Sequence, residues 1–87
     1  SRLGGLESAF VTGDYAAGRD SGLIDLVLVG EIDRGRLEHL IAKTEGLIQR
    51  KIRTLVVSEA ECQKLKPRFA EEPVLLLLES LPVKVQL

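Results

Sequence analysis

Two apolar runs within residues 6–30 flank a short polar loop that is bounded by glycines. The first run, Leu6 to Thr12, is rich in β-favouring residues and predicts a strand. The second run, Leu23 to Val29, is nearly continuous and is closed by Gly30, as expected of a central strand buried on both faces. About ten residues connect the runs, at the lower limit for a parallel crossover, so we expect an antiparallel or splayed pair.

The longest helical pattern follows the second run. Asp33 can cap its N-terminus, and Arg50 and Lys51 suit the negative end of its dipole. One predicted buried face follows the three-and-four spacing of a helix: Leu37, Leu40, Ile41, Thr44, Leu47 and Ile48. A basic stripe lies on the other side: Arg36, His39, Lys43 and Arg50. We interpret this stripe as a solvated face, and a docking surface for an acidic partner is the alternative.

Residues 52–57 predict a third strand. The helix before it is long enough for a right-handed crossover, so this strand should lie parallel to the second. Ser58 and Glu61 form a capping box that starts a short helix, which Pro67 should end or kink. Cys62 is expected to be a packed core residue rather than a reactive thiol, because no cationic motif brackets it.

The C-terminal part of the chain is less clearly patterned. Pro73 is suited to the first position of a helix, and we expect a short helix through residues 74–78, although periodicity also allows a buried strand. A final strand is expected from Val83 to Leu87. The predicted fold class is therefore α/β (α+β), a mixed β-sheet with helices packed on it. Residues 1–5 are interpreted as a linker remnant and residues 6–87 as a single domain.

Composition and charge exclude several classes of protein. A net charge of −1 gives no global field that would draw the chain to nucleic acid or to a membrane surface. A single cysteine excludes an internal disulfide and fits a reducing cytosol. No signal peptide or membrane span is evident, so the predicted location is cytoplasmic. Because the chain starts at Ser1, we interpret it as a piece of a longer protein, and a cloning scar on a complete small protein is the alternative.

The loop between the first two strands has the glycine spacing of a phosphate-binding P-loop. Such a loop needs a Lys for the terminal phosphates and a Ser or Thr for magnesium, whereas Arg19 and Asp20 occupy those positions. It also needs a substantial helix directly afterwards, and there is no room for one before Leu23. A working P-loop is therefore not expected.

A second motif consists of Gly13, Tyr15, Ala16 and Gly18, followed on the next strand by Ile24-Asp25-Leu26. It resembles the signature of the minimal nucleotidyltransferase domains of the polymerase β superfamily, and the element order strand, loop, strand, long helix, strand is also similar. The resemblance implies two-metal phosphoryl chemistry. Carboxylates at i and i+2 of one strand share a face and hold divalent cations, and the glycine turn lets backbone amides approach the triphosphate.

The chain departs from this family at its chemical positions. Leu23 stands where the family has its first metal carboxylate, and Asp14 replaces the family's Ser. If the site is active, the resemblance assigns catalysis to Asp25, Asp14 and Asp20, with Asp25 as the metal ligand and Mg²⁺ as the cofactor. The corresponding ligand loop would use Gly13, Tyr15, Gly18, Arg19 and Ser21. The alternative function is thus a Mg-dependent nucleotidyltransferase acting on a nucleoside triphosphate.

We favour the interpretation that the motif is retained as a scaffold without catalysis and without a cofactor. The chain then resembles the degenerate nucleotidyltransferase-like domains found behind winged-helix DNA-binding domains in some bacterial transcriptional regulators. This predicts a regulatory or assembly domain that senses a small ligand, or associates with itself or with another domain or protein. DNA would be contacted only through a winged-helix domain preceding Ser1. A third hypothesis is the nucleotide-binding half of a toxin and antitoxin pair.

Overall fold

The computed structural model describes residues 4–79. Within this range the elements follow one another as β1 (Gly4–Thr12), α1 (Gly13–Ala16), β2 (Leu23–Ile32), α2 (Arg34–Ile48), β3 (Lys51–Val57), α3 (Glu59–Phe69) and β4 (Leu75–Glu79). They form a mixed α+β fold, which confirms the predicted class. In this part of the chain no helix is both long and apolar enough to cross a membrane.

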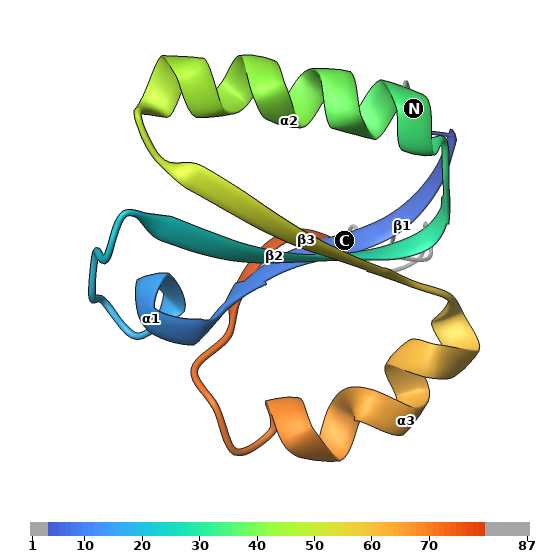
Figure 1. Cartoon of the computed structure of the whole chain (residues 1–87). Coiled ribbons are helices and arrows are strands. Elements are labelled where there is room, and N and C mark those ends of the chain that lie inside the picture. Colours follow the sequence, from blue (N-terminus) through green and yellow to red (C-terminus); the bar gives the residue numbers. More distant parts are fainter. Residues whose placement is uncertain (1–3, 80–87) are drawn as a thin grey trace, which may run out of the picture.

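The four strands form one sheet in the order β3-β2-β1-β4. β1 runs antiparallel to both β2 and β4, and β3 runs parallel to β2. The antiparallel first pair and the parallel third strand are thus confirmed. A parallel neighbour needs a crossover connection, and α2 supplies it. Figure 1 shows α2 on one face of the sheet and α3 on the other.

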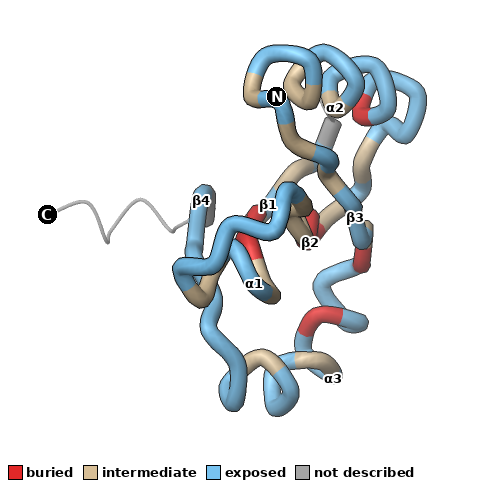
Figure 2. The backbone as a smooth tube through the Cα atoms, turned by 60° about the vertical axis from the view of Figure 1, so that its left-hand side comes forward, coloured by how far each residue is buried: buried red, intermediate tan, exposed pale blue. Residues whose placement is uncertain are grey.

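The central strand β2 is buried on both faces, as its apolar run predicts. Val27 and Val29 pack toward α3, with Cys62 in the same cluster, whereas Leu28 packs toward α2. This division follows from the alternation of side chains along a strand. Figure 2 shows buried residues in the central strands β1 and β2, at the end of β3 and in the two helices α2 and α3, whereas β4 is exposed at the edge of the sheet. Cys62 is buried, and its burial raises the pKa of its thiol.

The predicted helix caps are confirmed. The side chain of Asp33 accepts a hydrogen bond from the Arg36 N–H at 3.1 Å, and Ser58 and Glu61 form a reciprocal capping box. The hydrogen bond donated by the Ser58 N–H lowers the pKa of Glu61. At the other end of α2, Arg50 Nη1 donates to the Ile48 carbonyl at 2.9 Å. Local sequence signals therefore set the start of both long helices.

The predicted buried face of α2 is wrong in part. Leu37 is buried and Ile41 packs beside it, but Leu40 is 44% exposed and Leu47 is 75% exposed. Relative to the predicted orientation, the helix is rotated about its axis, and Ile41 and Glu45 line one cavity with Thr54 of β3. This rotation turns the Leu40 and Leu47 flank away from the sheet. The sequence pattern shows a wide apolar stripe but not which part of it meets the sheet.

Of the two effects expected of Pro67, ending α3 or kinking it, the first does not occur, because the helix continues through Pro67 to Phe69. The missing N–H of Pro67 removes one helical hydrogen bond, and only the last turn follows it. That turn is closed by the Ala70 N–H, which donates to the Lys66 carbonyl at 2.9 Å. It is also anchored by Phe69, whose ring packs edge-on against Phe10 with centroids 5.1 Å apart.

The helix expected after Pro73 is also wrong, because Leu75–Glu79 forms β4. Phe10 and Val11 of β1 lie opposite Leu76 and Leu75 in the ladder. The free edge of β1 offers unpaired backbone groups, and this tertiary pairing outweighs the local helix preference of leucine. The strand predicted from Val83 to Leu87 lies outside the described residues.

β1 also begins earlier than predicted. Gly4 lies opposite Ile32 and Gly5 opposite Glu31, so the strand includes two of the five residues assigned to the linker. The remaining three residues of that predicted linker lie outside the described range.

Candidate functional site

The loop between β1 and β2 folds as a short helix followed by a turn. The helix is α1, a single turn from Gly13 to Ala16. Gly13, Gly18 and Gly22 all have positive φ, at 72°, 84° and 83°. A Cβ atom at Gly13 would lie 2.8 Å from Asp25 Oδ2. Glycine at this position therefore lets the Asp25 carboxylate approach the start of the loop.

Asp25 is ion-paired to the neighbouring strand. It lies opposite Arg53 in the parallel ladder of β2 and β3, and Arg53 Nε donates to Asp25 Oδ1 at 2.5 Å. The hydrogen bond and the charge of Asp25 raise the pKa of Arg53. Leu23 is two residues before Asp25 on the same strand, so the position that shares its face carries no carboxylate. Asp25 thus has a cationic partner where a metal site needs a second acid.

Asp20 is held by the end of α2. Arg50 Nε donates to both carboxylate oxygens at 3.0 and 2.9 Å, and Arg50 Nη2 also contacts Oδ2. The Gly22 N–H donates to Asp20 Oδ1 at 3.1 Å. The hydrogen bonds from Arg50 have the largest effect and that from Gly22 the next, and together they hold the pKa of Asp20 below its usual range. The side chain therefore ties the loop to the segment between α2 and β3.

Asp14 pairs within the loop itself. Arg19 Nη2 donates to Asp14 Oδ1 at 3.0 Å, and the Arg19 N–H donates to the Asp14 carbonyl at 2.8 Å. Each of the three candidate carboxylates consequently has its own arginine. Across residues 4–79, no group of three or more His, Cys, Asp or Glu side chains is placed to hold a metal ion.

A cavity of about 430 Å³ lies beside Asp25 and is lined by Gly13 and Arg53. Arg68 and Glu72 contribute to it from α3 and the segment that follows. The other residues predicted for the site do not line it: Asp14, Tyr15, Gly18, Arg19, Asp20 and Ser21. The fold thus brings together Gly13 and Asp25 but separates them from the rest of the predicted site.

Arg53 and Arg68 were not singled out by sequence reasoning. The position of Arg53 follows from the register of β3 against β2, which a predicted parallel pair leaves open. Arg68 follows Pro67, which was expected to end or kink the helix. A predicted α3 that continued through Pro67 would have carried Arg68 on its last turn.

No protein-family model, curated protein or solved structure matches this chain. The resemblance to the polymerase β superfamily therefore stays a prediction that rests on the motif around Gly13 and Asp25.

Acid is expected to weaken the fold in part through Asp20. Its lowered pKa means that the folded state binds fewer protons than the unfolded chain in acid. The stabilisation is present above the unfolded pKa and is lost as the pH falls through the lower folded pKa. In Asp20→Asn, we expect a shallower fall of the Tm, measured by circular dichroism, between about pH 6 and pH 3. The effect should be small because the pair is exposed.

Arg50→Gln is the matched variant, because it removes the main cause of the shift and leaves the carboxylate in place. It should give a profile shallower than that of the wild type. Wild-type slopes in both variants would contradict the contribution of this ion pair.

Proposed function

We propose that the chain is a non-catalytic, nucleotidyltransferase-like regulatory and assembly domain. The observation that carries this proposal is the pairing of Asp14, Asp20 and Asp25 with three different arginines. A two-metal site needs carboxylates that are free to share divalent cations. An arginine at hydrogen-bond distance instead places a fixed positive charge where the metal would sit, and this charge repels a divalent cation.

The rival is a Mg-dependent nucleotidyltransferase that uses Asp25 with Asp14 or Asp20. This reaction would require the pair between Asp25 and Arg53 to open before a metal could bind. It would also require Asp14 or Asp20 to reach a cavity that neither of them lines. These two requirements favour the non-catalytic function.

The assembly role is supported by β4. Within residues 4–79 this strand pairs with β1 on one side, and its outer edge is open. The side chains of its first three leucines are largely exposed, from 47% at Leu75 to 58% at Leu77. An edge strand with unpaired backbone groups and exposed apolar side chains is a template for adding another strand. We therefore assign β4 as the surface through which two copies pair.

An antiparallel pair of β4 strands also suits the charges. The strand LLLLE is apolar in all but its last residue, so its sequence adds little charge repulsion to a two-fold pair. The low net charge of −1 adds little repulsion between copies.

The cellular setting follows only from the family resemblance. On the basis of this resemblance, the domain works in the bacterial cytoplasm as the C-terminal part of a transcriptional regulator. DNA would then be contacted by a winged-helix domain that precedes Ser1, and pairing through β4 would bring two such domains together.

Sedimentation equilibrium tests this proposal. The wild-type chain should sediment as a dimer at concentrations approaching about 1 mM. Leu75→Lys should shift the chain toward the monomer, because a charged edge residue opposes strand addition. Leu47→Lys is the matched control, since Leu47 is an exposed leucine on α2, and it should leave association unchanged.

Two results would contradict the proposal. One is a wild-type chain that remains monomeric across this concentration range. The other is magnesium-dependent transfer of label from a nucleoside triphosphate that Asp25→Asn abolishes, which would establish the enzymatic rival.

A further inference from the structure

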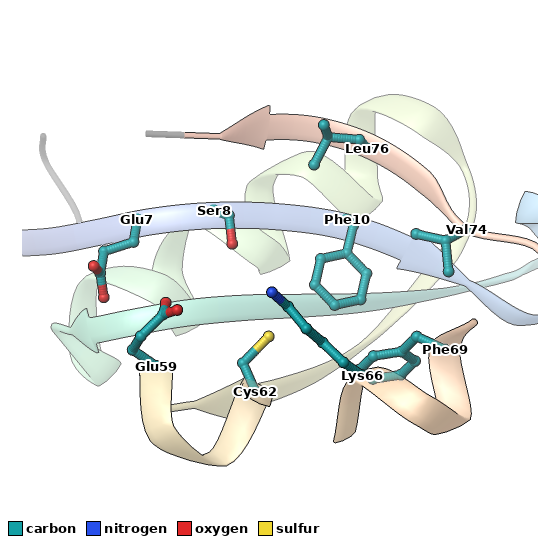
Figure 3. A pocket seen from close by; sticks show the side chains of 9 residues that line it. All are labelled: Glu7, Ser8, Phe10, Glu59, Cys62, Lys66, Phe69, Val74 and Leu76. Atoms are coloured by element: carbon teal, nitrogen blue, oxygen red, sulfur yellow. The ribbon is translucent and has the colours of Figure 1, made fainter. Parts of the chain in front are cut away.

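A second cavity, of about 410 Å³, lies between α3 and the strands β1 and β4 (Figure 3). Asp25 and the loop between β1 and β2 do not line it. Its volume is that of a pocket for a small molecule. Phe10, Phe69, Val74 and Leu76 give it an apolar wall, and Cys62 points its sulfur into the same space. Burial raises the pKa of Cys62, so the thiol is neutral and adds to this apolar wall.

A β-bulge aims an additional charged residue into this cavity. Leu6 lies opposite Gly30 and Ser8 opposite Val29, so Glu7 is the extra residue of β1. Regular alternation would place Glu7 and Ser8 on opposite faces of the sheet. Both of them nevertheless line the cavity. The bulge has therefore turned Glu7 toward α3, which is a common effect of bulges beside binding sites.

The charged groups of the cavity are arranged in a definite order. Figure 3 shows the carboxylates of Glu7 and Glu59 at one end and the rings of Phe10 and Phe69 toward the other. The ammonium group of Lys66 lies between these two ends. The cavity thus presents negative charge, then positive charge, then aromatic surface.

These charges are available to a ligand. Among the described residues, the side chains of Glu7 and Lys66 have no hydrogen-bond or ion-pair partner. Glu59 Oε1 accepts one hydrogen bond from Gln63 Nε2 at 2.9 Å, which leaves Oε2 free. Unpaired charges beside an apolar wall favour a molecule that supplies both opposite charges and an apolar group.

We propose that this cavity binds a free α-amino acid with an apolar side chain. The ammonium group of the ligand lies between Glu7 and Glu59, and its carboxylate accepts a hydrogen bond from Lys66. The side chain of the ligand packs against Phe10 and Phe69. A zwitterion fits better than an anion or a cation, because each of those leaves one charge of the cavity unmatched.

This inference goes beyond the proposed function and does not depend on it. Neither the ion pairs of the loop between β1 and β2 nor the outer edge of β4 takes part in the binding. A monomeric chain that binds the amino acid would refute self-association and leave the cavity assignment intact.

Isothermal titration calorimetry with leucine and with phenylalanine tests the assignment on the whole chain. Both amino acids should bind in a one-to-one ratio. Leucine amide lacks the carboxylate and N-acetyl-leucine lacks the ammonium group, so each should bind about tenfold more weakly than leucine. Equal binding of leucine and its two derivatives would overturn the proposed recognition of a zwitterion.

Variants separate the two ends of the ligand. Lys66→Met should weaken leucine binding about tenfold, because the ligand carboxylate loses its hydrogen bond to Lys66. The binding of leucine amide should be unchanged, because this ligand has no carboxylate. Glu7→Gln should weaken the binding of leucine and of leucine amide alike. Lys64→Met is the matched control on α3, since Lys64 does not line the cavity, and it should bind like the wild type. No binding of either amino acid at about 10 mM would overturn the proposal.

Discussion

Gly30→Ala is expected to lower the free energy of unfolding by about 2–4 kcal/mol. Gly30 has a φ of 129°, a conformation that L side chains rarely adopt. An added Cβ would also collide with the Gly5 carbonyl oxygen and lie 3.1 Å from the Glu7 backbone nitrogen. These are backbone atoms of the bulge in β1, so they cannot move aside as a flexible side chain could. Relieving the collision requires the two central strands to separate locally.

Gly46→Ala is the matched control for this substitution. Gly46 lies inside α2, and nothing comes within 4 Å of an added Cβ there. Because alanine is the better helix former, this change should stabilise the fold by about 0.5–1 kcal/mol. Urea denaturation followed by circular dichroism measures both variants. Similar stabilities of the two variants would contradict the close approach of β1 and β2 at Gly30.

Leu37→Ala should destabilise the fold by about 2–5 kcal/mol. Leu37 is the buried residue of α2, only 4% exposed, and packs against Ala9 and Leu28. Removing its side chain leaves a cavity between α2 and the sheet and loses the transfer free energy of the buried methyl groups.

Leu47→Ala makes the same chemical change on the same helix at an exposed position. Its effect should stay within about 0.5 kcal/mol. Urea midpoints of the two variants decide between the two possible buried faces of α2. Equal losses would support the wide apolar face that the sequence pattern predicts, and unequal losses would support the rotated helix.

The sequence predicts those parts of the fold that depend on local signals. The caps at Asp33 and Ser58 and the apolar run of β2 were sufficient to locate the long helices and the central strand. β4 was missed because its strand conformation depends on pairing with β1, a contact made far along the chain. Leucines are equally compatible with a helix, so only that pairing decides.

The same distinction applies to the candidate site. Gly13 and Asp25 could be brought together from the sequence, because they flank one connection between neighbouring strands. Two of the three arginine partners could not, since Arg50 is 30 residues from Asp20 and Arg53 is 28 residues from Asp25. Their positions depend on strand register and on where α2 ends. The sequence therefore locates the carboxylates of the candidate site but not the distant arginines that pair with them.

The two strands at the centre of the sheet, β1 and β2, are also the first two along the described chain. Only the loop of residues 13–22 connects β1 to β2, whereas the connection from β2 to β3 includes the whole of α2. Because short closures cost less entropy, folding can begin in the middle of the sheet and proceed to both edges. β3 and β4 then attach to a finished central ribbon. We therefore expect the two edge strands, β3 and β4, to form after the central pair.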